Sequence, residues 1–243
     1  MHAGYCHKEF EKMKTVTIGD IHGQPDWKKV NPADYDIIIF LGDYIDSNTI
    51  EDQEMLDNLA EIVALKKRFP RKVKLLLGNH ENSYLFRQYR TTGYRYDIAE
   101  QITTILSDNS GLFQVAWQYR NYLWTHAGIH SDFYNQKLAS CVLQTDKSLA
   151  ATLERLFSEE YRALFEVGYE RGGWDEKMTG GPFWIDKSRL LKDPLRGYHQ
   201  IVGHTPVETV EHYYPFEDDE NTSVTFCDCI GFGDGSFYSL EIQ

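Results

Sequence analysis

The most constraining feature of the sequence is a repeated pairing of a short apolar run with a polar motif that directly follows it. The pairing occurs five times, and the motifs, in chain order, are Gly19-Asp20-Ile21-His22-Gly23, Gly42-Asp43-Tyr44-Ile45-Asp46, Gly78-Asn79-His80-Glu81, His126-Ala127-Gly128 and Gly203-His204-Thr205. Runs rich in Val, Ile and Leu are typical of strands that are buried on both faces of a sheet. Because ligands of α/β sheets bind where the strands end, we expect the five motifs to meet at one sheet edge.

Strands and helices alternate in the first half of the chain, which predicts an α/β fold with a mostly parallel sheet. Apolar runs predict strands over residues 16–18, 37–41 and 73–77. An apolar stripe predicts a helix over residues 50–69, with Thr49 and Asp52 forming a capping box at its start. Further helices are predicted near Asn79 and over residues 96–106, followed by two strands between 112 and 124 that turn at 119–121.

The second half contains a long segment, residues 130–184, that separates the fourth motif from the neighbourhood of the fifth. A helix is predicted inside it over residues 148–165, followed by a loop rich in glycine and aromatic residues. We interpret this insert as a substrate cap on a single domain that spans residues 1–243, because it has no linker composition. Strands are predicted over residues 207–213 and 237–242.

Composition excludes several classes of protein. The formal charge of -12 argues against binding of long nucleic acids, which requires clustered Lys and Arg. The apolar runs are too short for a membrane span of roughly 20 residues, and the first residues lack the apolar segment of a secretory signal. Four cysteines without a framework spacing fit reduced thiols, so we expect a cytoplasmic protein. The sequence predicts no oligomeric state.

The side chains of the motifs suit a pair of divalent cations. Hard cations prefer carboxylate and imidazole ligands, and two cations roughly 3.5 to 4 Å apart need a ligand that bridges them. Asp20 and His22 can reach one ion together, and Asp43 can bridge to a second ion. The second ion would be completed by Asn79, His126 and His204. Five weak signals in this order are hard to ascribe to chance.

These motifs resemble those of the calcineurin-like metallophosphoesterases, in particular the phosphoprotein phosphatase branch and its bacterial and phage relatives, over residues 15–242. The resemblance implies a sandwich of two mixed β-sheets flanked by helices and a dinuclear site filled by manganese, iron or zinc. It implies that Asp20, His22 and Asp43 hold the first ion. It also implies that Asp43, Asn79, His126 and His204 hold the second, and that a metal-bound hydroxide attacks phosphorus.

The resemblance also implies that His80 protonates the leaving oxygen. Local chemistry supports this role, because His80 adjoins a metal ligand and a histidine near its ordinary pKa can give a proton at neutral pH. Asp46 is expected to orient the imidazole through its other nitrogen. We expect Glu81 to point away from the site and to serve the structure.

One departure from the family pattern concerns phosphate binding. The family's phosphatases commonly continue the second motif with Arg and Gly, whereas this chain has Ser47 and Asn48, and serine cannot make the bidentate contact of a guanidinium. Candidates to replace the missing arginine are Arg87, Arg90, Arg95, Arg171, Arg189 and Arg196. Trp174, Phe183 and Trp184 could frame a pocket for a peptide or a base, although such aromatic residues more often belong to a core.

A second departure favours the phosphoprotein phosphatase branch: His204 is followed by Thr205 and Pro206, so the second histidine of many phosphodiesterase relatives is absent. The sequence thus predicts a phosphomonoesterase acting on phosphoserine, phosphothreonine or a small phosphate ester. One alternative is the hydrolysis of dinucleoside polyphosphates or other nucleotide phosphoesters. Another is a scaffold that has lost catalysis, against which the presence of all six ligands, His80 and Asp46 argues.

Overall fold

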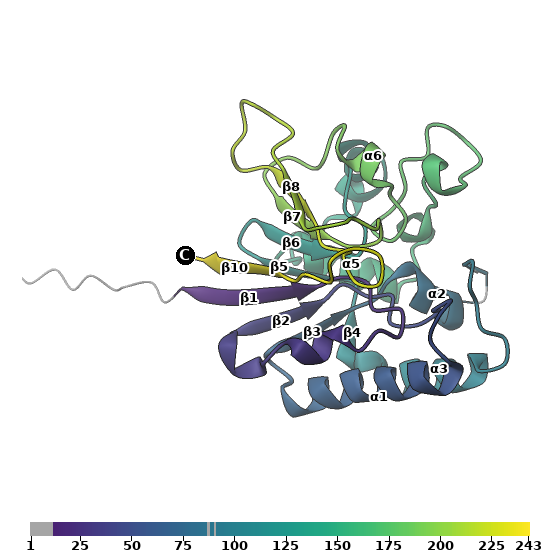
Figure 1. Cartoon of the computed structure of the whole chain (residues 1–243). Coiled ribbons are helices and arrows are strands. Elements are labelled where there is room, and N and C mark those ends of the chain that lie inside the picture. The colour runs from purple at the N-terminus through teal and green to yellow at the C-terminus, as the bar shows by residue number, and fades with distance from the viewer. Residues whose placement is uncertain (1–11, 87, 90) are drawn as a thin grey trace, which may run out of the picture.

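The computed structural model describes residues 12–86, 88–89 and 91–243, and the strands of this part form two five-stranded sheets that pack face to face (Figure 1). The first sheet has the order β10-β1-β2-β3-β4. Its strands are β1 (Met13–Ile18), β2 (Ile37–Phe40), β3 (Val73–Leu76), β4 (Phe113–Gln114) and β10 (Tyr238–Ile242). Strands β1 to β4 run parallel, and β10 joins β1 antiparallel, which brings the C-terminus beside the start of β1.

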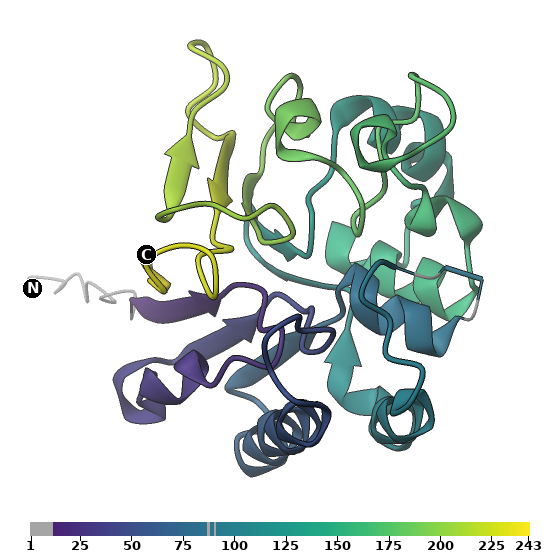
Figure 2. The ribbon, with the colours of Figure 1, turned by 45° about the vertical axis from the view of Figure 1, so that its right-hand side comes forward.

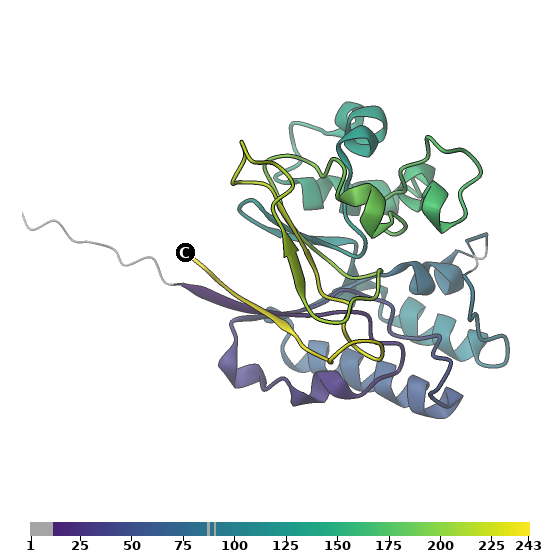
Figure 3. The same ribbon diagram turned by 45° about the horizontal axis from the view of Figure 1, so that its top comes forward.

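The second sheet has the order β5-β6-β7-β9-β8. Its strands are β5 (Ala116–Tyr119), β6 (Tyr122–Thr125), β7 (His199–Val202), β8 (Glu211–Tyr213) and β9 (Ser223–Phe226). Strands β6, β7 and β9 run parallel, whereas β5 and β8 are antiparallel edges, so both sheets are mixed. In both Figure 2 and Figure 3 the purple and blue N-terminal part lies below most of the green and yellow part. The predicted fold class, a sandwich of two mixed sheets flanked by helices, is confirmed.

Strand β2 shows why the first sheet must be covered on both faces. Ile38 and Phe40 pack into the cluster formed with α1 (Asp52–Arg68) and α3 (Ala99–Asp108), which lie below this sheet in Figure 1. Ile39, between them, packs into the cluster that contains Trp124 and Ile201 of the second sheet. Because side chains alternate along a strand, an uninterrupted apolar run supplies both cores at once.

The start of α1 differs from the prediction. Helix α1 begins at Asp52 with Glu51 as its N-cap residue and no side-chain cap, so the predicted capping box of Thr49 and Asp52 is wrong. The hydroxyl of Ser47 instead accepts hydrogen bonds from the backbone N–H groups of Thr49 and Ile50, at 3.2 and 3.1 Å. A serine two or three residues upstream competes for the local N–H groups and turns the chain before the helix starts.

The insert contains shorter helices than predicted. Ser148 caps α5 (Leu149–Ser158) by accepting from Ala151 N at 3.1 Å, but the helix ends well before residue 165. The positive φ of 53° at Glu160 breaks it, and a separate 3-10 turn follows at Arg162–Phe165. The remaining α-helices of the described residues are α2 (Asn79–Leu85), α4 (Ser131–Phe133) and α6 (Lys187–Leu190). The single domain over residues 1–243 stays a prediction.

The predicted strand over residues 207–213 is reduced to β8, the first of the two strands predicted between 112 and 124 is divided into β4 and β5, and β9 was not predicted. Strand β4 pairs with β3 at the edge of the first sheet, and β9 pairs with β7 and β8 in the second sheet. Among the described residues, no helix is both long enough and apolar enough to cross a bilayer.

Candidate metal centre

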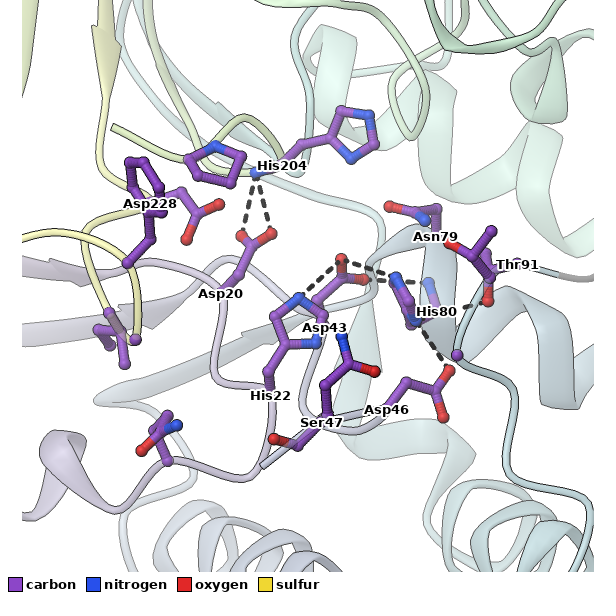
Figure 4. Close-up of a pocket in the computed structure, with 18 of the residues that line it drawn as sticks. Asp20, His22, Asp43, Asp46, Ser47, Asn79, His80, Thr91, His204 and Asp228 are labelled. Atoms are coloured by element: carbon purple, nitrogen blue, oxygen red, sulfur yellow. Dashed lines mark hydrogen bonds and ion pairs between the residues drawn. The ribbon is translucent and has the colours of Figure 1, made fainter. Parts of the chain in front are cut away.

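The carboxyl ends of the parallel strands of both sheets meet at one edge of the sandwich, and the predicted site residues follow those ends directly. Asp20 and His22 follow β1, Asp43 and Asp46 follow β2, Asn79 and His80 follow β3, His126 follows β6, and His204 follows β7. All of them except His126 line one pocket of about 490 Å³, in which their side chains point toward one another (Figure 4). His126 is fully buried against them. The chain thus brings all eight predicted residues together.

Backbone strain is concentrated at this edge. His22, Asp43, Asp46 and His204 have positive φ angles of 41°, 49°, 67° and 64°. The left-handed conformation is uncommon for residues other than glycine and costs of order 1–3 kcal/mol at each position. Such strain persists only where the surrounding structure holds it, and here it aims four side chains into the pocket.

Two motif glycines are explained by close approach to the carboxylates. A Cβ at Gly78 would lie 2.0 Å from Oδ1 of Asp43, and one at Gly203 would lie 2.2 Å from Oδ1 of Asp20. Any side chain at these positions would displace a carboxylate, so the glycines belong to the motifs for steric reasons.

Glu81 lies beneath the site and holds two of its loops together. Its buried carboxylate accepts hydrogen bonds from the backbone N–H groups of Asp43, Tyr44 and Gly78, each at 2.8 Å. These bonds tie the loop after β2 to the start of α2. The side chain therefore serves the structure.

Replacing Glu81 by alanine is expected to lower the free energy of unfolding by about 3 kcal/mol or more, because each buried N–H group left unpaired costs roughly 1–3 kcal/mol. Urea unfolding followed by circular dichroism measures the change. Glu100→Ala, at an exposed position of α3, is the matched control and should change stability by less than about 0.5 kcal/mol. Equal stability of the two variants would show that the three bonds do not hold the loops.

The first group of converging ligand atoms consists of Asp43, His126 and His204, whose atoms lie within 4.8 Å of one another. Nδ1 of His126 lies 2.9 Å from the carbonyl oxygen of Leu41. An N–H at Nδ1 leaves a lone pair on Nε2, and that atom faces Oδ1 of Asn79 at 2.8 Å and Nδ1 of His204 at 3.1 Å.

A cation placed between these atoms would accept a lone pair from each of them. Burial lowers the pKa of His126 and, more strongly, that of His204, so both imidazoles stay neutral and keep a lone pair at neutral pH. Neutral imidazole, carboxylate and amide oxygen are suitable ligands for a divalent transition metal. These residues therefore fit a metal ion.

The second group consists of His22, Asp43 and His80, again with ligand atoms within 4.8 Å of one another. Nδ1 of His22 lies 2.7 Å from the carbonyl oxygen of Ile45, which directs Nε2 toward Oδ2 of Asp43 at 3.8 Å. Nε2 of His80 lies 3.9 Å from the same oxygen. Asp43 thus belongs to both groups.

Asp20 belongs to neither group. Its carboxylate accepts hydrogen bonds from the backbone N–H of His204, at 3.0 and 3.1 Å, and lines the same pocket. Burial, Asp228 and Asp43 raise the pKa of Asp20 well above its usual value. Asp228, which follows β9, also lines the pocket, and burial together with the charge of Asp43 raises its pKa to about 7. Cations bound here would relieve this crowding of negative charge.

His80 and Asp46 form a hydrogen-bonded pair. Nδ1 of His80 lies 2.7 Å from Oδ2 of Asp46, as the dashed line in Figure 4 shows. Burial lowers the pKa of His80, but the charge of Asp43 and the bond to Asp46 outweigh it and raise this pKa to about 9. Positive ions at Asp43 would bring the pKa down again. The predicted contact between the two side chains is present.

Of the candidate arginines that the structure describes, Arg171 is the one that lines the pocket. Its Nε lies 2.9 Å from Oδ2 of Asp186, and its Nη2 donates to Oγ1 of Thr205 at 2.5 Å. Arg95 instead donates to the carbonyl oxygen of Ser47. Arg189 and Arg196 pair with Glu170 and Asp218 outside the pocket, and Arg87 and Arg90 lie outside the described residues.

The three aromatic residues suggested for a pocket do not act together. Trp184 lines the pocket, Phe183 is buried in the core of the insert, and the side chain of Trp174 is 84% exposed. The three side chains lie apart because the irregular loop that carries them runs from the surface to the core. The sequence pattern does not reveal the path of this loop.

With this geometry in view, comparison with known proteins gives a direct result. The sequence profile described as calcineurin-like phosphoesterase matches residues 13–227. The chain belongs to the calcineurin-like phosphoesterase family. Members of this family are metal-dependent phosphoric ester hydrolases, and candidate metal ligands are in place in this chain.

The chain is also similar to a curated protein and to a solved structure. The chain is 34% identical over 79 residues to a putative serine/threonine-protein phosphatase of Schizosaccharomyces pombe; the match covers 30% of this chain and about a quarter (24%) of that protein. The crystal structure of a cold-active protein-tyrosine phosphatase from a psychrophilic Shewanella species has a TM-score of 0.56 at 18% identity, covering 94% of this chain and 75% of that one. The second likeness shows a shared fold.

Among the residues at the site that sequence reasoning missed are Asp228 and Tyr84. Asp228 follows the unpredicted strand β9, and the pattern of an apolar run followed by an acid could have revealed it. Tyr84 donates its hydroxyl hydrogen to Oδ1 of Asp46. The only feature of the sequence that could have indicated this contact is the position of Tyr84 one helical turn after His80.

Proposed function

We propose that this metallophosphoesterase is a dinuclear phosphomonoesterase. The observation that carries the proposal is that Asp43 belongs to both groups of converging ligand atoms, as a residue that bridges two cations must. Asp43 is joined by His126 and His204 in one group and by His22 and His80 in the other.

In this proposal Asp20, His22 and Asp43 hold one ion, and Asp43, Asn79, His126 and His204 hold the other. Manganese is the ion we expect, with iron or zinc as alternatives. Two such cations supply Lewis-acid polarisation of the phosphoryl group and lower the pKa of water, so that hydroxide is available at neutral pH.

The chain's own groups complete the reaction. His80 is placed to give a proton to the leaving oxygen through Nε2, because its Nδ1 is engaged with Asp46. Arg171 replaces the arginine that is missing at Ser47, since it lines the pocket and its guanidinium is held by Asp186 and Thr205. The insert then acts as a substrate cap by supplying Arg171 and Trp184.

Arg171→Ala is expected to raise KM for a phosphomonoester and the inhibition constant of inorganic phosphate by roughly 10- to 100-fold, because a hydrogen bond to a charged group contributes about 1.5–3 kcal/mol. Steady-state kinetics measure both constants. Arg189→Ala removes an arginine that is paired with Glu170 on the same insert and should leave both unchanged. If Arg171→Ala binds phosphate as tightly as the wild type, another group holds the substrate.

The proposed substrates are phosphoserine, phosphothreonine or small phosphate esters. The name of the Schizosaccharomyces pombe relative supports the first two. Among the described residues, the pocket is lined by one arginine. So few positively charged side chains suit a single phosphate better than a polyanion. A cytoplasmic location is part of this proposal.

A nucleotide phosphoester is the second candidate. Phe232 lines the pocket while 67% of its side chain is exposed, and Trp184 lines it as well. Exposed aromatic rings in a polar pocket are suitable platforms for a nucleobase.

The deciding experiment measures hydrolysis by manganese-reconstituted protein of four substrates: p-nitrophenyl phosphate, bis-p-nitrophenyl phosphate, a phosphoserine peptide and a dinucleoside tetraphosphate. Dominant cleavage of the two monoesters supports the proposal. Preference for the diester or the dinucleotide would transfer the assignment to nucleotide hydrolysis. Absence of any hydrolysis with two metal ions bound would leave the scaffold alternative.

A further inference from the structure

We propose that Tyr84 is a positioning residue for proton transfer, which it serves by fixing the carboxylate of Asp46. The inference rests on the proposed function, in which His80 protonates the leaving oxygen. Oδ2 of Asp46 lies 2.7 Å from Nδ1 of His80, and Oδ1 accepts the hydroxyl hydrogen of Tyr84. Both oxygens of this buried carboxylate are therefore engaged, one by the proton donor and one by the phenol.

The helix geometry explains how one element holds Asp46 from two sides. His80 and Tyr84 lie four residues apart on α2, so their side chains project from the same face one turn apart. Asp46 belongs to the loop after β2 and reaches between them. A carboxylate that bonds two side chains of one helix cannot rotate without breaking at least one bond.

Tyr84 is itself held in place by the segment that follows α2. The backbone N–H of Arg95 donates to its phenolic oxygen at 2.8 Å, and its ring stacks on that of Tyr94 with a centroid distance of 4.4 Å. Only 3% of Tyr84 is exposed. The phenol oxygen accepts from the backbone and the phenol hydrogen goes to Asp46, so the direction of the bond is set.

The arrangement has a specific chemical consequence. An imidazole delivers a proton only if its ring is aimed at the leaving oxygen, and groups that orient such a ring typically change activity by roughly 10- to 100-fold. Without the hydroxyl, Oδ1 of Asp46 would lose its partner and the carboxylate could turn away from His80. Binding of the phosphate at Arg171 would not be affected.

The experiment compares Tyr84→Phe with the wild type on two monoesters that differ in leaving group. The serine side chain would leave phosphorus as an alkoxide, which needs the proton. The leaving group of 2,4-dinitrophenyl phosphate is a stable phenolate, which needs the proton far less. We expect kcat on the phosphoserine peptide to fall about 10-fold with KM unchanged, and kcat on dinitrophenyl phosphate to fall much less. Metal content, measured in the same preparation, should equal that of the wild type.

Tyr44→Phe is the matched control. Tyr44 is also fully buried near the site, but its hydroxyl donates to the carbonyl oxygen of Leu76. The control should lose stability without a difference between the two substrates. Equal losses on both substrates in Tyr84→Phe, or no loss on either, would overturn the positioning role.

A double-mutant comparison provides a second readout. If Tyr84 acts through Asp46, then adding Tyr84→Phe to Asp46→Asn should lower kcat on the phosphoserine peptide no further. A full additional 10-fold loss would contradict the inference. A wild type that hydrolyses neither ester would overturn the proposed function as well, whereas an active wild type with an unaffected Tyr84→Phe would overturn the role of Tyr84 alone.

Discussion

Asp43→Asn should deplete both metal positions and lower kcat/KM for a phosphomonoester by roughly 10³ to 10⁴. Oδ2 of Asp43 lies 3.5 Å from Nε2 of His126 and 3.8 Å from Nε2 of His22, so it is the one carboxylate shared by the two ligand groups. Loss of metal stabilisation costs several kcal/mol, and each 1.36 kcal/mol corresponds to about a tenfold change in rate. Elemental analysis of the reconstituted variant, together with kinetics, measures both effects.

Asp20→Asn provides the contrast, because the proposal assigns Asp20 to one ion only. Its carboxylate contacts the backbone of His204 and belongs to neither group that contains Asp43. This variant should lose one metal ion and retain part of the second. If Asp43→Asn kept the metal content of the wild type, Asp43 would not be a bridge, and the dinuclear proposal would lose its main support.

His80→Asn should lower kcat by roughly two to four orders of magnitude while leaving metal content nearly intact, because it removes a general acid. The side chain is bonded to Asp46 through Nδ1, which fixes the ring and sustains its positive charge. The loss should be largest on a phosphoserine peptide and smallest on dinitrophenyl phosphate. Kinetics on both substrates and elemental analysis measure these expectations.

His80 also lies within reach of the cation position shared by His22 and Asp43, so a ligand role is the competing explanation. Loss of metal ions together with activity in His80→Asn would favour that explanation. An equal loss of kcat on both leaving groups would also argue against proton donation. Either result would redirect the role of Asp46 as well, since the carboxylate acts through His80.

The sequence predicted the edge at which the site lies because strand ends are local features. Each motif follows an apolar run, and parallel strands place their carboxyl ends together, so eight residues spread from position 20 to position 204 could be assigned to one place. The alternation of Ile38, Ile39 and Phe40 between two cores is likewise written in the local pattern. Both inferences needed only the positions of the apolar runs and the alternation of side chains along a strand.

What the sequence could not reveal depends on contacts between distant segments. The bond between Tyr84 and Asp46 joins residues 38 positions apart, and the pairing of Arg171 with Asp186 depends on the path of an irregular loop. The capping box at Thr49 failed for a local reason instead, because Ser47 competes for the N–H groups of the turn. Side-chain networks of this kind have no periodic signature.

The site also shows where the local rules are broken for a purpose. Four site residues adopt positive φ angles, and carboxylates at Asp20, Asp43 and Asp228 are buried close together. Neither feature favours folding in isolation. The crowding of carboxylates becomes favourable when positive charge is bound between the loops, so we expect metal ions to stabilise the fold as well as to support hydrolysis.

The most direct test of the account is a titration of chelator-stripped protein with Mn²⁺, followed by the rate of p-nitrophenyl phosphate hydrolysis. The account predicts no activity without metal and a rate that rises until about two equivalents per chain are bound. Full activity in the stripped protein, or saturation at one equivalent, would contradict a dinuclear metal centre built around Asp43.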